Sequence, residues 1–284
     1  MRILFVGHVS KDFNIANGKK VLVPGGGVFY GSIAAARLGA STAVLTKCAL
    51  ADRELFKQME EAGVDVNYLD SDSTTSIENV YTGPNTDERT SRMLSRAAPF
   101  RNEDLLSIEA DAIHVNPLWY GEFPENLIPL IRERATFLAG DAQGFLRNVE
   151  EDGSMVYKDW DKKSEYLRFF DLFKVDAKEA RIITGETELK KACEKLHVWG
   201  ARMVIATHSD GVILFDGSRF YESRFDGWTM EGRTGRGDTC TAAFLVALLH
   251  LKKGVSEATE FAARITSEKM KYPGPYSSIT TAGR

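Results

Sequence analysis

The stretch TGRGDTCTAAFLVALL, residues 234–249, joins a glycine-rich turn to an apolar run that has the character of a buried helix. Gly235 and Gly237 allow positive φ angles and place no Cβ atom beside the start of that helix. The free N–H groups and the dipole at a helix start favour a bound anion. Asp238 follows at once, and its carboxylate would compete with the anion if it were only a helix cap. The pattern therefore predicts an anion site in which Asp238 has a chemical role of its own.

A carboxylate beside an anion site is suited to accept a proton from a neutral reaction partner. Asp238 would take the proton of a hydroxyl group while the Gly235–Asp238 amides hold a phosphoryl group. An ordinary Asp cap after a flexible glycine turn is the alternative for an isolated GxGD pattern. The adjacent Arg236 either places positive charge over the phosphate or points to solvent and contributes only its amide.

Strands and helices alternate along the chain on the N-terminal side of this stretch. RILFVG (2–7) and STAVLTKCAL (41–50) are strand-like, and GGGVFYGSIAAARLG (25–39) is a glycine-opened helix between them. ADRELFKQMEEAG (51–63) has the apolar spacing of an amphipathic helix. Strand-like and helical segments continue at 111–116, 136–143, 171–185, 188–200 and 256–272. This order predicts βαβ units around a mostly parallel sheet, which is an α/β fold.

Two polar segments interrupt the alternation. Residues 12–23 and 73–98 contain short alternating runs, and the second also has a turn signal, GPN, at 83–85. We expect them to form a small β lid outside the main sheet, with a plain surface loop as the alternative for the second segment. The α/β core then consists of residues 1–11, 24–72 and 99–284.

Composition narrows the classes of partner. Lys plus Arg (36) nearly balance Asp plus Glu (40), and the net charge of −4 gives no basic face for a nucleic acid. No window approaches the roughly twenty apolar residues that span a bilayer, and no secretory h-region begins the chain. The three cysteines, Cys48, Cys193 and Cys240, have no metal-binding spacing. We expect a cytoplasmic protein with a small-molecule partner, without nucleic-acid or membrane partners.

Five segments resemble the signatures of the PfkB/ribokinase family of carbohydrate kinases. The opening stretch is similar to the family pattern DTxGAGDxF, with Gly232 at the leading Asp and Arg236 between the glycines. GGGVFYGSIAAARLG is similar to the N-terminal signature, with Tyr30 at the usual Asn. The other three are VGHVSKD (6–12), DAKEARIITG (176–185) and VIATHSDGVILFDG (204–217), and all five come in family order over nearly the whole chain.

The resemblance implies a ribokinase-like three-layer α/β/α fold and transfer of the γ-phosphoryl group of ATP to a hydroxyl. The acceptor would be a small sugar or polyol, such as inositol, a ketose, an aldose or a sugar acid. Asp238 would be the general base, with Gly235, Arg236 and Gly237 around the transferring group. Asp12, Gly26 and Gly27 would face the acceptor. The strand end at 111–116 adds Asn116 as a candidate substrate contact.

On the donor side, the resemblance implies nucleotide and magnesium binding. The family's N-x-x-E pattern has Asp176 in place of Asn and keeps Glu179, the candidate for a water-mediated contact to Mg²⁺. The family's T-x-G-x-x-G turn keeps Thr207 and Gly211 and has Ser209 in place of its first Gly. These five residues are the expected ATP contacts.

Several alternatives stay open from the sequence. Neither the G-x-G-x-x-G turn of a dehydrogenase nor the G-x-x-x-x-G-K-[ST] loop of a P-loop kinase is present. Within the resemblance, a nucleoside kinase is one alternative to a polyol kinase. A catalytically weak sugar-binding sensor is another, because three family positions are replaced. The edge strands of the lid could also pair two copies of the chain into a homodimer.

Overall fold

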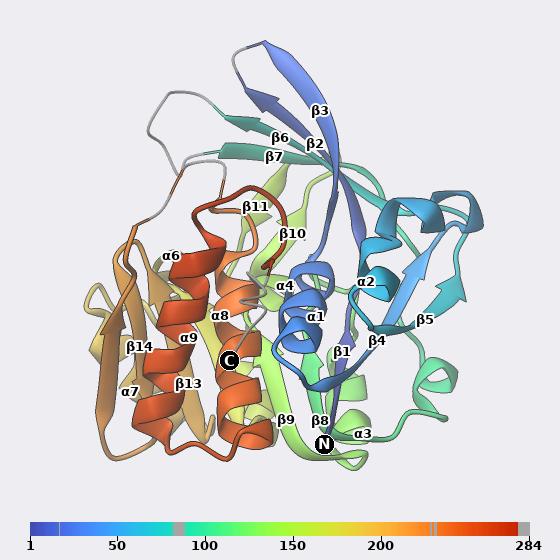
Figure 1. Ribbon diagram of the computed structural model, residues 1–284. Coiled ribbons are helices and arrows are strands. Elements are labelled where there is room, and N and C mark those ends of the chain that lie inside the picture. The colour runs from blue at the N-terminus through green and yellow to red at the C-terminus, as the bar shows by residue number, and fades with distance from the viewer. Residues whose placement is uncertain (17, 82–88, 228, 230–231, 278–284) are drawn as a thin grey trace, which may run out of the picture.

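In the computed structural model, the described residues are 1–16, 18–81, 89–227, 229 and 232–277. They form a nine-stranded sheet in the order β15-β14-β13-β12-β9-β8-β1-β4-β5. A smaller sheet lies above the carboxyl ends of its parallel strands (Figure 1). The neighbours from β5 to β13 pair in parallel, and β14 and β15 are added antiparallel. The strands of the large sheet are β1 Arg2–Val6, β4 Ser41–Cys48, β5 Asp65–Asp70, β8 Ala110–Val115, β9 Ala135–Asp141, β12 Leu172–Asp176, β13 Met203–His208, β14 Gly211–Phe215 and β15 Phe220–Arg224.

Helices cover both faces of the large sheet, each over its own apolar core. The helices α1 (Gly27–Arg37), α8 (Arg236–Leu245) and α9 (Val255–Lys269) pack in one core, and Figure 1 shows all three in front of the sheet. The other core includes residues of α3 (Ile128–Arg132), α6 (Ala177–Thr184) and α7 (Leu189–Val198). The predicted three-layer α/β/α fold with a mostly parallel sheet is therefore confirmed.

Shorter elements complete the core. They are α4 (Gln143–Leu146), α5 (Lys163–Tyr166), the hairpin β10 (Arg147–Val149) with β11 (Met155–Tyr157), the 3₁₀ turns Asn102–Leu105, Glu125–Leu127 and Leu167–Phe169, and a π-helical turn Val246–His250 after α8. No helix of the described residues has the length and apolar character needed to cross a bilayer.

The single helix predicted over 51–63 is wrong in form. The chain folds there as a 3₁₀ helix, Leu50–Phe56, and one α-helical turn, α2 (Gln58–Glu61). Tertiary contacts account for the difference, because Asp52 accepts a hydrogen bond from Thr74 Oγ1 at 2.6 Å and pairs with Lys11 at 2.8 Å. These partners hold Asp52 at a position that it would not have in a regular helix.

The smaller sheet, hereafter the small sheet, contains β2 (Ser10–Ala16), β3 (Lys19–Gly25), β6 (Thr75–Tyr81) and β7 (Arg89–Ser95) in the order β3-β2-β6-β7. β2 pairs antiparallel with β3 and parallel with β6, and β7 pairs antiparallel with β6. It rises above the carboxyl ends of the parallel strands in Figure 1. The turn predicted at 83–85 lies outside the described residues.

Candidate active site

The site begins where α8 starts, at the carboxyl edge of the parallel strands, the usual place for a ligand in an open α/β sheet. Gly235 is the N-cap residue of α8, with φ of 80°. A Cβ atom at Gly235 would lie 2.4 Å from the ring of Tyr30. Both this close contact and the positive φ require glycine at this position. Tyr30, which stands where the family pattern has Asn, therefore packs against the turn that precedes Asp238.

The sequence predicts that the four backbone amides of residues 235–238 hold the phosphoryl group, and one of them needs a correction. The N–H of Arg236 donates to the carbonyl of Arg233 at 3.1 Å, so it cannot also face an anion. Gly237 and Asp238 follow in the first turn of α8, where N–H groups have no carbonyl partner within the helix. The predicted anion site, hereafter the cradle, can thus use the amides of Gly235, Gly237 and Asp238.

Asp238 stands at one end of a chain of side-chain amides. Asn116 Nδ2 donates to Asp238 Oδ1 at 2.9 Å, and Gln143 Nε2 donates to Asn116 Oδ1 at 2.9 Å. Asn116 follows β8 and is fully buried, and a Cβ atom at Gly27 would lie 2.2 Å from its Nδ2. Gly27 therefore makes room for Asn116, and Asn116 orients the carboxylate of Asp238.

A buried ammonium lies beneath the cradle. A Cβ atom at Gly237 would be 3.2 Å from Lys174 Nζ, which comes from β12. Lys174 Nζ lies 3.2 Å from Asp141 Oδ2 and 3.4 Å from Glu179 Oε2. Burial lowers the pKa of Lys174, but the carboxylates of Asp141 and Glu179 raise it by more. The net pKa of Lys174 is therefore above its ordinary value. Lys174 is therefore a permanent cation under the predicted phosphate site.

The two carboxylates beside Lys174 are themselves buried. Burial raises the pKa of Glu179 to about 7, and the Asp176 carboxylate adds to this effect while Lys174 opposes it. Burial likewise raises the pKa of Asp141, against the lowering effect of Lys174. Asp176 and Glu179 form a reciprocal cap at the start of α6, each accepting from the other's backbone N–H at 2.7 Å.

The residues at this end of the site fit a magnesium ion held mainly by the donor and by water. Glu179 Oε1 is buried and has no hydrogen-bond partner among the described residues, so it has an acceptor position for a metal-bound water. Asp176 Oδ1 already accepts the Glu179 N–H, which makes Asp176 the weaker candidate. Within the described part of the chain, no cluster of three His, Cys, Asp or Glu side chains forms a metal cage.

Thr207 is a predicted nucleotide contact, and Arg236 is predicted to lie beside the transferring group. Thr207 is buried at the end of β13, and its Oγ1 would lie 3.8 Å from a Cβ atom at Gly237. Arg236 is largely shielded, and burial lowers its pKa while the nearby acids Asp176 and Asp210 oppose that effect.

Ser209 and Gly211 lie further along the same hairpin. Ser209 is exposed in the turn before β14. A Cβ atom at Gly211 would lie 2.4 Å from the Ser223 carbonyl, so strand packing already accounts for this glycine. The geometry thus brings Thr207 to the cradle and leaves Ser209 at the surface.

On the acceptor side, Asp12 comes from β2 of the small sheet. Burial raises the pKa of Asp12, and the neighbouring Ser10 hydroxyl and the charges of Arg89 and Arg147 oppose this rise. Asp12 Oδ1 has no hydrogen-bond partner among the described residues. Burial raises the pKa of Tyr30, and both Asp12 and Asp238 raise it further, so the two acids lie near the same ring.

Gly26 has a structural reason to be glycine. Its φ is 101°, and a Cβ atom there would lie 2.6 Å from the His8 carbonyl. Gly26 therefore allows the close approach of two chain segments at the base of the small sheet, before α1 begins at Gly27.

Sequence reasoning missed Lys174, Asp141, Gln143 and Arg147. Lys174 interrupts the apolar strand LFKVD, and Asp141 ends the apolar strand ATFLAGD. A charged residue inside or at the carboxyl end of a buried parallel strand is a signal that could have identified both. Arg147 affects the pKa of Asp12 and is itself influenced by Glu179 and Asp176, so it lies between the acceptor and donor ends.

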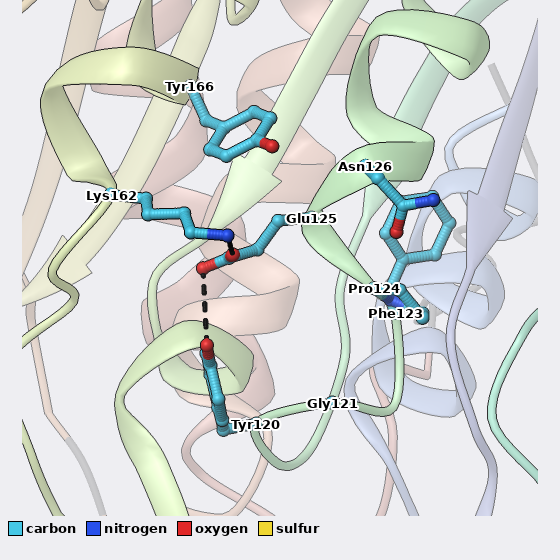
Figure 2. A pocket seen from close by; sticks show the side chains of 8 residues that line it. All are labelled: Tyr120, Gly121, Phe123, Pro124, Glu125, Asn126, Lys162 and Tyr166. Carbon is cyan, nitrogen blue, oxygen red and sulfur yellow. Dashed lines mark hydrogen bonds and ion pairs between the residues drawn. The ribbon is translucent and has the colours of Figure 1, made fainter.

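A separate surface pocket lies away from these residues. It has a volume of about 240 Å³ and is lined by Tyr120, Gly121, Phe123, Pro124, Glu125, Asn126, Lys162 and Tyr166. Figure 2 shows Lys162 and Tyr120 turned toward Glu125, with Lys162 Nζ 3.2 Å from Glu125 Oε2 and Tyr120 Oη 3.5 Å from Glu125 Oε1. None of the predicted site residues lines this pocket.

Comparisons with known proteins identify the family of the chain. The sequence model of the pfkB family of carbohydrate kinases matches residues 5–282. A pyrophosphate-dependent kinase in the ribokinase family, solved with a pyrophosphate analogue and myo-inositol, is 49% identical, with a TM-score of 0.92 over 97% of each chain.

More distant proteins also match this chain. Ribokinase of Arabidopsis thaliana, solved with ribose and ATP, is 19% identical, with a TM-score of 0.77 over 96% of this chain and 94% of that chain. A cytidine kinase of Thermococcus kodakarensis is 26% identical over 263 residues, which are 86% of this chain and 87% of that protein.

Proposed function

This chain belongs to the pfkB family of carbohydrate kinases and is a sugar or polyol kinase, and we propose that it moves a phosphoryl group from pyrophosphate to a hydroxyl of an inositol-like polyol. The relative solved with a pyrophosphate analogue and myo-inositol supports this choice of donor and acceptor. The observation that carries the proposal is the position of Asp238, in the first turn of α8, held by Asn116 at 2.9 Å beside a glycine-formed cradle.

In the proposed reaction, Asp238 is the general base. Asn116 occupies one oxygen of its carboxylate, and the other accepts the proton of the acceptor hydroxyl. The hydroxyl oxygen forms a bond to phosphorus as the bond from phosphorus to the leaving phosphate breaks. The amides of Gly235, Gly237 and Asp238 stabilise the charge on the transferring group.

Cations near the cradle support a donor without a nucleoside. Pyrophosphate has no base or ribose to bury, so its binding depends on charge. Lys174 lies beneath Gly237, and Arg236 stands where the family pattern has a small residue. Ser209 is exposed and Gly211 is explained by strand packing, so neither position requires a nucleotide. ATP, which the sequence predicts, is the alternative donor.

Magnesium fits the same end of the site. When bound, Mg²⁺ would neutralise charge on the donor phosphates. Glu179 would hold it through a water at Oε1, with Asp176 nearby. Asp12 would accept hydrogen bonds from acceptor hydroxyls, and the small sheet that carries it would act as a lid.

Assembly and location complete the proposal. β3 is an edge strand of the small sheet, and its Val21 and Leu22 are 42% and 46% exposed, which supports pairing of two copies through this edge. The cysteines Cys48, Cys193 and Cys240 are free and buried, which supports a reducing, cytoplasmic setting.

The test is a matrix of two donors and three acceptors with the purified protein. Mg²⁺ with pyrophosphate or ATP is combined with myo-inositol, ribose or cytidine, and the phosphorylated product is measured. We expect turnover with pyrophosphate and myo-inositol, and a loss of about 10³-fold or more in kcat for Asp238→Asn. Asp72→Asn, at an exposed acid, is the matched control and should leave kcat unchanged.

Each other outcome of the matrix has a defined meaning. Product with ATP alone would replace the proposed donor, and product with cytidine alone would make the chain a nucleoside kinase. Binding without product, unaffected by Asp238→Asn, would indicate a sensor and reject the kinase mechanism.

A further inference from the structure

The end of α9 holds the loop that leads into Asp238. Thr229 N–H donates to the Met270 carbonyl at 2.9 Å, and Gly232 N–H donates to the Thr229 carbonyl at 3.2 Å. A Cβ atom at Gly232 would lie 2.0 Å from the Met270 carbonyl. Gly232 stands where the family pattern has Asp, and this contact explains why only glycine fits here.

Lys269, the last residue of α9, reaches under the same loop. Its Nζ donates to the backbone carbonyls of Gly232 and Thr234, and the residue is only 3% exposed. The ammonium also lies 5.6 Å from the centre of the Tyr30 ring, the ring that packs against Gly235. A buried ammonium is stable only with such oxygen partners. This cation therefore has a fixed place behind the cradle.

Because the peptide bond is planar, these contacts determine the direction of the Gly235 N–H group. The Thr234 carbonyl and the Gly235 N–H belong to one trans peptide unit and point in opposite directions. Because Lys269 holds the Thr234 oxygen, the Gly235 N–H must point away from Lys269. Gly235 has φ of 80° and no side chain that could fix that peptide plane.

We propose that Lys269 is a positioning residue for phosphoryl transfer, whose ammonium fixes the peptide planes before α8 so that the Gly235 amide faces the transferring group. The inference rests on the proposed function, because it assigns the cradle to the phosphoryl group. Burial lowers the pKa of Lys269 to about 8, opposed by Asp238, in keeping with a charge enclosed by protein. Lys269 itself touches neither donor nor acceptor in this proposal.

The experiment removes the ammonium and then returns it in solution. For Lys269→Ala, we expect kcat with pyrophosphate and myo-inositol to fall about 100-fold, the scale of one lost donor at a developing charge. KM for myo-inositol should change by less than about threefold, because the acceptor contacts lie elsewhere. Added methylammonium should restore kcat at least about tenfold, whereas sodium chloride of equal ionic strength should not.

Two controls separate positioning from folding. Lys271→Ala removes an exposed lysine two residues further on and should behave as the wild type. If Lys269→Ala does not fold, Lys269→Met keeps the volume of the stem and should still show a loss in kcat without a matching change in KM. Wild-type kcat in a folded Lys269 variant, or a loss in Lys269→Ala that methylammonium leaves unchanged, would overturn the proposal.

The same assays distinguish this inference from the function on which it rests. An active Asp238→Asn variant would reject the proposed general base and, with it, the phosphoryl cradle. An inactive Asp238→Asn variant beside a fully active Lys269→Ala variant would reject only the positioning role.

Discussion

At the scale of single residues, Lys174 has the most demanding surroundings in the site. Its ammonium lies between two carboxylates that are 0% and 1% exposed, those of Asp141 and Glu179. Removing one partner from a buried ion pair leaves an uncompensated charge, which costs far more than the pair contributes. We therefore expect Lys174 to be required for stability as well as for the charge of the proposed cradle.

The pH dependence of stability follows from Glu179. Its pKa is about 7 in the folded protein and about 4.5 unfolded, so the unfolded chain releases this proton first. The stability linked to Glu179 is thus complete below about pH 4.5 and is lost as the pH rises through about 7. Without Lys174, the pKa of Glu179 would rise further and the loss would extend to higher pH.

We predict that Lys174→Met lowers the free energy of unfolding by about 3–5 kcal/mol at alkaline pH and by less at acidic pH, where the carboxylates are protonated. Urea denaturation across this pH range measures the difference. Lys191→Met is the control, because Lys191 forms an exposed pair with Glu188 at 2.8 Å that contributes little. A difference between Lys174→Met and wild type that is independent of pH would contradict the assignment.

At the scale of elements, the small sheet is joined to the core at His8. The four connections of this sheet meet there: His8 itself leads into β2, its carbonyl abuts Gly26 after β3, and its ring contacts Thr75 Oγ1 at 3.0 Å and the Ala98 carbonyl at 3.1 Å. Glu122 Oε1 accepts the His8 N–H at 2.6 Å. These contacts fix where β2 leaves the core, and with it the position of Asp12.

The ring of His8 is neutral. Burial lowers its pKa to about 3, and the Ala98 carbonyl needs a donor, so Nε2 carries the proton and Nδ1 accepts from Thr75. Thr75→Val removes that donor and leaves a buried nitrogen without a partner. The contacts of His8 that join the small sheet to the core then lose about 1 kcal/mol of hydrogen bonding.

We predict that Thr75→Val raises KM for the polyol about fivefold, since about 1.4 kcal/mol corresponds to tenfold, and leaves kcat within about threefold. Steady-state kinetics with varied acceptor measure this. Thr90→Val, at an exposed position of β7, should change neither constant. An unchanged KM in Thr75→Val would show that the contacts of His8 do not position Asp12 for the acceptor.

At the scale of the whole molecule, charge is distributed unevenly. The chain carries a net charge of −4, yet Lys174 and Arg236 gather at the donor end of the site. An anionic donor must approach a negative protein, and at the site it must pair closely with Lys174 and Arg236, which already have acids beside them. The polyol acceptor is neutral and is insensitive to the field.

We predict that raising the salt concentration from about 50 to about 300 mM increases KM for pyrophosphate several-fold and leaves KM for the polyol nearly constant. Kinetics with each substrate varied in turn, at constant free Mg²⁺, give both values. A parallel rise of the two constants would mean that salt acts on the fold and not on donor binding.

Much of this organisation follows from local sequence. A helix that begins at an anion site needs glycine before it, so Gly235, Gly237 and Asp238 stand out by spacing alone. Alternating strand and helix patterns suffice to predict the parallel sheet, because each pattern depends on residues close together in the chain. The family resemblance extends this reading to the kinase fold.

Other features depend on residues far apart. Asn116 and Asp238 are 122 positions apart and meet only because β8 ends and α8 begins at the same edge of the sheet. From the sequence, Gly27 is predicted to face the acceptor and Gly232 departs from the family pattern. The structure shows each of these glycines making room for a distant atom. The sequence by itself determined the alternation of strands and helices and the acid at the start of α8. Tertiary structure alone decided its partners, because burial and charge pairing arise between segments that no local pattern connects.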